Sequence, residues 1–201
     1  MALLPQELDF SEWTISRPIA DGRHGRSVLI NGTDGYAPKL QLADPTDDFF
    51  TIKEVQEQHV LLEPGSSEQV ELLEKLDAFA IEQALTHCAD WFGKQLTADT
   101  IQSLYRPLTA EALRLRISRS CNFYVLERDR YRTVTITQLQ EGQRVLPCVQ
   151  INGMYFKTRE MGLSLGCSDL LVRLPPQPWP FRLAATVQPA SGCLLPEHDE
   201  L

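Results

Sequence analysis

The segment CADWFGKQLTADTIQSLYRPL (residues 88–108) leads into LRLRI (residues 113–117), and this junction decides how the chain is interpreted. In LRLRI, apolar and basic residues alternate with the period of two that is typical of a strand. The apolar residues then face a core, and the arginines lie on the open side. The junction therefore predicts a helix followed by basic strands, a pattern that favours a binding protein over an enzyme.

Upstream of this junction, the sequence predicts one long helix over about residues 67–92. Ser66 stands three residues before Gln69, the spacing of a capping box at a helix start. Gly93 is well placed to end the helix. Apolar residues recur between these ends at steps of three and four, which predicts one buried face. This face comprises Val70, Leu73, Leu76, Ala80, Ala84 and Cys88.

On both sides of the helix the sequence predicts strands. The segment NGTDG (31–35) predicts a hairpin turn, and Asn152-Gly153 predicts a second tight turn. Short runs rich in β-branched and aromatic residues supply the strands themselves. The predicted strands are residues 13–16, 27–30, 39–42, 49–52, 113–117, 123–126, 133–136, 145–151, 154–157 and 170–172.

Together these elements predict a fold that is mainly β with one long helix, in the α+β class. A small barrel or a curled antiparallel sheet with the helix packed on it would bury both kinds of element. We expect one such domain over residues 1–173. Four prolines between residues 175 and 180 then predict an extended segment around Trp179, and residues 174–201 form a proline-rich and then acidic arm.

Several classes of function are disfavoured by composition. The five cysteines and four histidines of the 201 residues are scattered, so we expect no metal and no cofactor. No catalytic motif is recognisable, which favours a non-enzymatic protein. No apolar run has the length of a membrane span, and the first residues do not resemble a signal peptide. We therefore expect the nucleus or cytoplasm, although the final HDEL (198–201) matches an endoplasmic-reticulum retention signal.

The charge of the chain is distributed unevenly. The formal net charge is −8, but residues 94–173 carry 12 basic and 7 acidic residues, whereas residues 1–93 carry 6 basic and 17 acidic ones. Within the basic part, arginines alternate with tyrosines along the predicted strands. Cations can follow phosphates, and flat side chains can stack on unpaired bases. The candidate nucleic-acid-binding residues are Arg114, Arg116, Arg119, Tyr124, Arg128, Arg130, Tyr131, Arg132, Tyr155, Lys157 and Arg159.

Three segments also resemble a known family. They are GRSVLINGTDGYAPKLQL (25–42), ADWFGKQLTADTIQSLYRPL (89–108) and VLPCVQINGMYFKTREMGLSLGCSDLLVRL (145–174). They are similar to the single-stranded-DNA-binding proteins of large DNA viruses of algae and amoebae, which are akin to a replication protein of tailed phages. The resemblance implies an OB-type barrel that coats single-stranded DNA in replication, repair or recombination, and a viral factory as the location if the chain is viral.

In the phage relatives, a mobile acidic tail competes with DNA and recruits replication proteins. The resemblance therefore implies a partner-binding tail here, although Leu201 replaces the aromatic residue that ends the phage tails. That tail comprises Trp179, Glu197, Asp199, Glu200 and Leu201. A second hypothesis stays open: a β-rich protein–protein module or structural subunit of a larger assembly. The sequence does not decide whether the chain forms a homo-oligomer.

Overall fold

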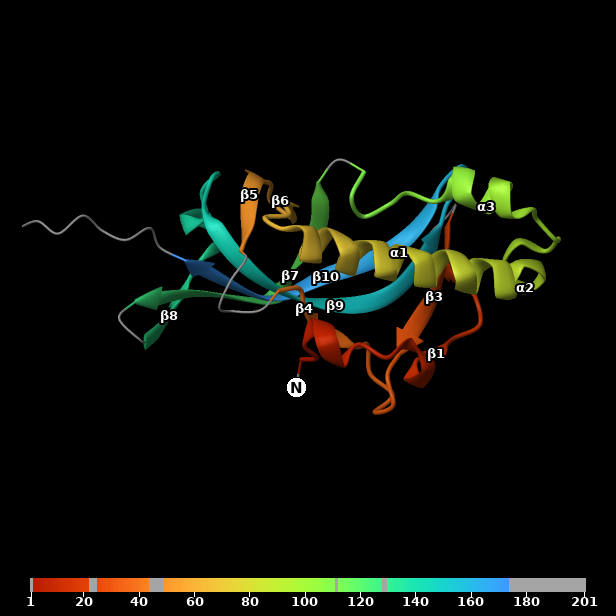
Figure 1. The fold of residues 1–201 in the computed structure, drawn as a ribbon, viewed down its shortest axis with the longest axis horizontal. Helices are drawn as coiled ribbons and strands as arrows, with labels where there is room; N and C mark the ends of the chain where they lie inside the picture. The colour runs from red at the N-terminus through yellow and green to blue at the C-terminus, as the bar shows by residue number, and fades with distance from the viewer. Residues whose placement is uncertain (1, 22–24, 44–48, 111, 128–129, 174–201) are drawn as a thin grey trace, which may run out of the picture.

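A computed structural model describes residues 2–21, 25–43, 49–110, 112–127 and 130–173. The fold is mainly β, as the sequence predicts (Figure 1). The strands are β1 (Thr14–Ile15), β2 (Ile19–Asp21), β3 (Gly25–Asn31), β4 (Lys39–Gln41), β5 (Phe50–Val55), β6 (His59–Glu63), β7 (Leu113–Glu127), β8 (Arg130–Val134), β9 (Arg144–Phe156) and β10 (Met161–Arg173).

Five of these strands close into a ring. Its order is β5–β6–β7–β10–β9, and β9 pairs again with β5 through Phe50 opposite Val145. All neighbours in the ring are antiparallel except β7 and β10, which run parallel. The sheet is therefore mixed, so the curled antiparallel sheet, one of the two predicted arrangements, is wrong. Apolar side chains from all five strands fill the core, among them Ile52, Leu62, Leu115 and Val149.

The other edge of β9 is occupied by successive segments of the N-terminal third. β3 pairs with residues 153–156, β4 with residues 148–150, and β5 with residues 144–145. Because β3 and β4 are both antiparallel to β9 along the same edge, they run in the same direction and cannot form a hairpin together. The predicted hairpin around residues 31–35 is therefore wrong, although Gly35 N donates to Gly32 O there at 3.0 Å.

Asn152-Gly153 is also not a turn. β9 continues through both residues, and its register with β10 shifts there, so that Ser164 lies opposite Gly153 and Leu165 opposite Ile151. This is a bulge within a long strand. Gly153 has φ +144°, and a Cβ on it would lie 1.8 Å from the carbonyl oxygen of Val28 in β3. Glycine is needed here because two strands pair with β9 at its bulge.

Some of the other predicted strand boundaries change as well. The predicted strands 113–117 and 123–126 are parts of one strand, β7. The predicted strand 133–136 is divided between β8 and the 3₁₀ helix Ile136–Gln138. β8 forms a hairpin with the end of β7, and this hairpin projects from the body of the molecule (Figure 1).

The predicted helix is divided in two. α1 spans Ser67–Thr86, and α2 spans Cys88–Phe92. His87 between them has φ −101° and ψ 18°, so its backbone is not helical. Both predicted ends are confirmed: the Ser66 side chain accepts from Gln69 N, and Gly93 adopts φ +70° after α2. A third helix, α3 (Ala98–Leu104), leads towards β7.

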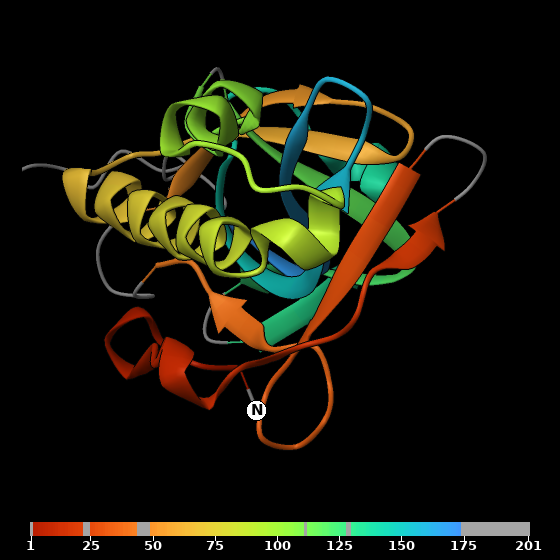
Figure 2. The same ribbon diagram turned by 90° about the vertical axis from the view of Figure 1, so that its right-hand side faces the viewer.

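α1 lies along one flank of the ring, and the N-terminal segment passes beside it (Figure 2). Phe10 and Trp13 of that segment pack on Phe79 of α1, with the Phe10 and Phe79 rings stacked at 4.6 Å. Leu73 and Leu76 of α1 are fully buried in the main core. In the part of the chain that the structure describes, no helix combines the length and apolarity that crossing a membrane requires.

Substitution of Gly153 tests the bulge. We expect Gly153→Ala to lower the free energy of unfolding by about 3 kcal/mol or more, because it adds both backbone strain and a clash with β3. Gly142→Ala is the control: Gly142 also has a positive φ, +80°, but its Cβ would meet nothing within 4 Å. That control should cost only about 1 kcal/mol. Urea unfolding measures the free energy of unfolding of both variants. Equal losses would show that the close contact between Gly153 and Val28 does not matter.

Candidate nucleic-acid interface

Four strands place a row of residues across the outer face of the ring. Gln150 in β9 lies opposite Gly166 in β10, Gly166 opposite Arg116 in β7, and Arg116 opposite His59 in β6. The flanking residues Leu115 and Ile117 face the core side, so the alternation predicted for this strand is confirmed. Arg116 therefore lies on an open sheet face beside a strand position that has no side chain.

His59 lies between two arginines on this face. Arg114 Nη2 is 3.4 Å from His59 Nδ1, and Arg116 is the register partner of His59. Burial lowers the pKa of His59, and the positive charges of Arg114 and Arg116 lower it further. The two guanidinium groups make the surface around His59 locally positive. His59 was not among the sequence candidates, because only the β6–β7 register brings it to the arginines.

Tyr155 lies flat on the neighbouring part of the same face. A Cβ on Gly162, its partner in β10, would meet the Tyr155 ring at 3.0–3.2 Å, so the ring crosses this glycine. The Lys157 ammonium lies 5.0 Å from the ring centroid. Arg106 and Arg114 both act electrostatically on the Tyr155 phenol, although burial keeps its pKa raised. The Tyr155 ring therefore lies between Gly162 and Lys157, and basic side chains surround its phenol.

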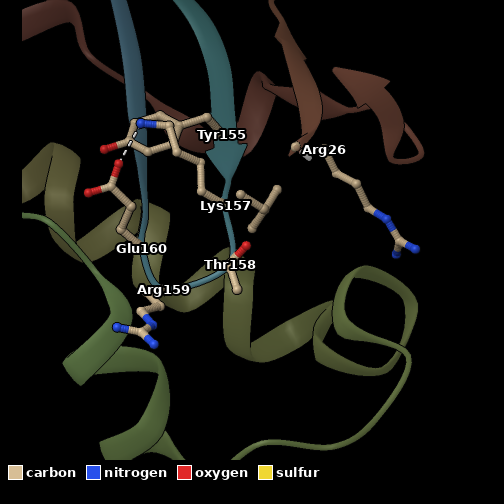
Figure 3. Close-up of a pocket in the computed structure, with 8 residues that line it drawn as sticks. Arg26, Tyr155, Lys157, Thr158, Arg159 and Glu160 are labelled. Atoms are coloured by element: carbon tan, nitrogen blue, oxygen red, sulfur yellow. Dashed lines mark hydrogen bonds and ion pairs between the residues drawn. The ribbon is translucent and has the colours of Figure 1, made fainter. Parts of the chain in front are cut away.

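The turn between β9 and β10 completes this cluster. Lys157 Nζ donates to Glu160 Oε1 at 2.5 Å, and Lys157 N donates to Glu160 O at 2.8 Å. Hydrogen bonding from Lys157 lowers the pKa of Glu160, and Arg106 adds to this effect. Figure 3 shows Tyr155, Lys157 and Glu160 together, with Arg159 directed away from them. Arg106 is a second basic residue that the sequence candidates did not include.

A shallow open hollow of about 590 Å³ adjoins the turn. Residues 155–160 line one part of it, and Gly25 and Arg26 of β3 line another. The Arg26 guanidinium lies apart from the Tyr155–Lys157–Glu160 group (Figure 3), and its Nη1 is 3.4 Å from the carbonyl oxygen of Trp91. Lys157 and Arg159 are exposed at this edge, so the hollow has a mostly basic rim.

The β7–β8 hairpin carries the second group of candidates. Tyr131 is 68% exposed, and its register partner Leu126 is 41% exposed, so both lie on one open face of the hairpin. Tyr124 lies on this face too, because it is two residues from Leu126. Arg130 and Arg132 flank Tyr131 along β8, and their side chains therefore project from the opposite face of the hairpin.

The structure thus divides the predicted site. Arg114, Arg116, Tyr155 and Lys157 share one part of the outer face, with Arg159 at its edge. Tyr124, Arg130, Tyr131 and Arg132 belong to the projecting hairpin at the other end of β7. The side chain of Arg119 is not described, and Arg128 and the predicted tail from Trp179 to Leu201 lie outside the described residues. Within the described ranges, His, Cys, Asp and Glu do not gather into a group of three that could hold a metal.

A buried hydrogen bond positions the segment that carries Arg106. The Tyr105 hydroxyl donates to Asp77 Oδ1 at 2.6 Å, and Leu108 N donates to Asp77 Oδ2 at 3.0 Å. Arg106 N in turn donates to Met161 O at 2.9 Å, which attaches the segment to the start of β10. Asp77 is 7% exposed, and burial raises its pKa to about 6 despite these hydrogen bonds.

Comparison with known proteins adds a family but no function. The profile of a family of unknown function (DUF5871) matches residues 48–177. The matched region contains all five strands of the ring, the three α-helices and the β7–β8 hairpin, whereas β1–β4 precede it. No curated protein matches the chain.

The pH dependence of stability tests the role of Asp77. Its folded-state pKa is raised above the ordinary value of 3.8, so the folded state binds this proton more tightly than the unfolded state. The resulting stabilisation is present below about pH 4 and is lost as the pH rises through about 6. We expect the free energy of unfolding of the wild type, relative to Asp77→Asn, to fall by up to about 2 kcal/mol between pH 4 and pH 7. Urea titrations at several pH values measure the free energy of unfolding of both proteins. A difference between them that does not change with pH would contradict the raised pKa of Asp77.

Proposed function

Because the chain belongs to the DUF5871 family, whose function is unknown, its activity must be inferred from its own residues, and we propose that it binds single-stranded nucleic acid without catalysis. The ligand that we propose is single-stranded DNA in replication, repair or recombination. The observation that carries this proposal is the position of four basic residues on the ring of strands. We call these residues, Arg106, Arg114, Arg116 and Lys157, the cationic cluster.

The order of strands in the ring supports an OB-like barrel. Numbered along the chain, β5, β6, β7, β9 and β10 are the first to fifth ring strands, and they pair in the order first, second, third, fifth, fourth. OB folds are five-stranded Greek-key barrels that bind oligonucleotides on the face of strands two and three and on the loops between strands one and two and strands four and five. In this chain the second and third strands carry His59, Arg114 and Arg116, and the loop between the fourth and fifth carries Lys157 and Arg159.

The chemistry of this surface suits a phosphate backbone. Arg114 and Arg116 project from the same strand at a spacing of two residues, and Arg114, Arg106 and Lys157 all act electrostatically on Tyr155. One guanidinium group can donate two parallel hydrogen bonds to the oxygens of a phosphate. This contact does not depend on the base sequence. The acidic member of the cluster, Glu160, is paired with Lys157. Binding should therefore be salt-sensitive and largely independent of sequence.

The β7–β8 hairpin extends the proposed path. β7 has 15 residues and would span about 50 Å if it were fully extended, so it connects the cationic cluster to the hairpin. Tyr131 offers an exposed ring at that end, and base stacking on such rings tolerates any base. A flexible single strand could follow this curved face, contacting cations at one end and tyrosine at the other.

The second candidate is a protein–protein module. Leu126 and Tyr131 expose apolar surface on a projecting hairpin, and such patches also mark protein interfaces. This hypothesis needs no basic face on β6 and β7, and the two proposals therefore predict different effects for Arg114 and Arg116. Recruitment of replication proteins through the C-terminal arm belongs to the first proposal and remains a prediction.

Substitution of the two strand arginines tests the binding proposal. We expect Arg114→Ala/Arg116→Ala to weaken binding of a labelled single strand of about 30 nucleotides roughly tenfold or more at low salt. The salt dependence should become shallower by about 0.7 in log–log slope for each phosphate that the variant no longer neutralises. Fluorescence anisotropy at several salt concentrations measures both quantities, with duplex DNA of the same sequence for comparison.

Lys75→Ala is a control that removes one charge outside the cluster, because Lys75 is exposed on α1. It should leave affinity and salt slope nearly unchanged. A loss of binding free energy about half that of the double variant would indicate attraction by overall charge alone. Absence of binding by the wild type at low salt, also after deletion of residues 174–201, would contradict the proposal and favour the protein–protein module.

Stacking at the hairpin can be tested separately. Tyr131→Ala should weaken single-strand binding by about 1–3 kcal/mol with little change in salt slope, because it removes a stacking surface and no charge. Tyr36→Ala provides the control: Tyr36 is 75% exposed and lines a different hollow, near Trp13 and Lys39. If the two variants bind equally well, the hairpin is not part of the nucleic-acid path.

A further inference from the structure

Two cysteines meet where β7 and β10 both depart from regular pairing. Cys167 in β10 lies opposite Ile117 in β7, but two residues later Asp169 lies opposite Asn122, five residues further along β7. Residues 118–121 of β7 have no register partner in β10, and Cys121 is the last of them. The side chains of Cys121 and Cys167 interact with each other across the two strands, and Cys121 packs against the core that contains Cys167.

Further contacts hold both sulfurs in place. Cys121 Sγ lies 3.9 Å from the carbonyl oxygen of Asn122, and Cys167 Sγ lies 3.6 Å from the carbonyl oxygen of Asp169. Asn122 and Asp169 are register partners, and Asn122 Nδ2 donates to Asp169 Oδ1 at 3.0 Å. Cys121 precedes Asn122 and Cys167 lies two residues before its partner Asp169, so the two cysteines are on neighbouring strands, which are about 4.8 Å apart.

From this geometry we propose that Cys121 and Cys167 form an oxidisable thiol pair, in which Cys121 reacts first with a peroxide and Cys167 then closes a disulfide. Both thiols are free in the structure. Cys121 is partly exposed, whereas Cys167 is 2% exposed, so Cys121 is the sulfur that an external oxidant can reach. This inference does not depend on the proposed nucleic-acid binding.

The interaction between the two thiols distinguishes the roles of the two sulfurs. The neighbouring Cys167 thiol lowers the pKa of Cys121, against the opposing effects of burial and Asp169. The same pairing, together with burial, raises the pKa of Cys167. The thiolate is the reactive form of cysteine, so the accessible member of the pair is also the one that ionises more readily.

The reaction balances with hydrogen peroxide as the oxidant. The Cys121 thiolate attacks one peroxide oxygen, the O–O bond breaks, and the departing hydroxide takes up a proton to become water, leaving a sulfenic acid. Cys167 then attacks the Cys121 sulfur, the S–S bond forms, and the hydroxyl group leaves with the Cys167 proton as a second water. The two thiols together lose two electrons and two protons, and the peroxide is reduced to two waters.

The other cysteines provide internal controls. Cys88 is buried, where its sulfur lies 3.0 Å from Leu96 N and 3.5 Å from the Lys94 carbonyl oxygen. Cys148 is partly exposed, and burial raises its pKa. Cys193 lies outside the described residues. Arginine and lysine residues separate Cys121, Cys148 and Cys167, so trypsin places each in its own peptide.

The experiment treats the reduced full-length protein with about one equivalent of hydrogen peroxide, blocks remaining thiols with iodoacetamide, and maps tryptic peptides by mass spectrometry. We expect a cross-linked peptide pair containing Cys121 and Cys167, lighter than the sum of the two thiol peptides by two hydrogen atoms. The pair should also form in Cys148→Ser and Cys193→Ser, and it should be absent from Cys121→Ser and Cys167→Ser.

A second measurement identifies the sulfur that reacts first. In Cys167→Ser the sulfenic acid cannot close the disulfide, so dimedone should label Cys121 more than Cys88 or Cys148. Labelling no greater than that of Cys148 would overturn the assigned order. A wild-type map in which Cys121 is linked to Cys148 or Cys193, or in which Cys121 and Cys167 both stay alkylated while other cysteines oxidise, would overturn the pair itself. The wild-type map decides this point even if a serine variant fails to fold.

Discussion

The hydrogen-bonding demand of β9 is the constraint on which the rest of the fold depends. One edge of this strand pairs with β10 over nearly its whole length, and the other edge is covered by β3, β4 and β5 in succession. An uncovered edge would leave a row of unpaired backbone groups. Pairing with β5 also closes the ring, so the same strand joins the N-terminal segment to the core and completes that core. Gly153 permits the bulge at which this double pairing is possible.

The candidate interface follows from the closure of the ring. Once β6, β7, β10 and β9 are neighbours, the outward residues of four strands lie side by side on one face. Glycines at positions 162 and 166 keep β10 free of bulky side chains there, and the Tyr155 ring occupies the space over Gly162. The Asp77–Tyr105 hydrogen bond holds the chain that brings Arg106 to the same region. Packing thus concentrates positive charge on the outer face of the ring, although the formal net charge of the protein is −8.

Local signals in the sequence were sufficient for several elements. The alternation in residues 113–117 predicted the strand that presents Arg114 and Arg116, and the Ser66 cap and Gly93 marked the helical region correctly. Local signals failed at Asn152-Gly153, where a dipeptide typical of turns lies inside β9, and at residues 31–35, where a turn joins strands that pair elsewhere. In both places the backbone conformation is set by a partner strand distant in the sequence, which a local pattern cannot indicate.

The sequence by itself determined that the protein is mainly β, which strand carries arginine on its open face, and that positive charge is concentrated in residues 94–173. Each of these properties resides in the order of neighbouring residues. Only the tertiary structure decided that His59 lies between Arg114 and Arg116, that Tyr131 faces away from Arg130 and Arg132, and that Cys121 meets Cys167. These contacts depend on strand register and bulges, because a shift of one residue would turn every side chain of a strand to the opposite face.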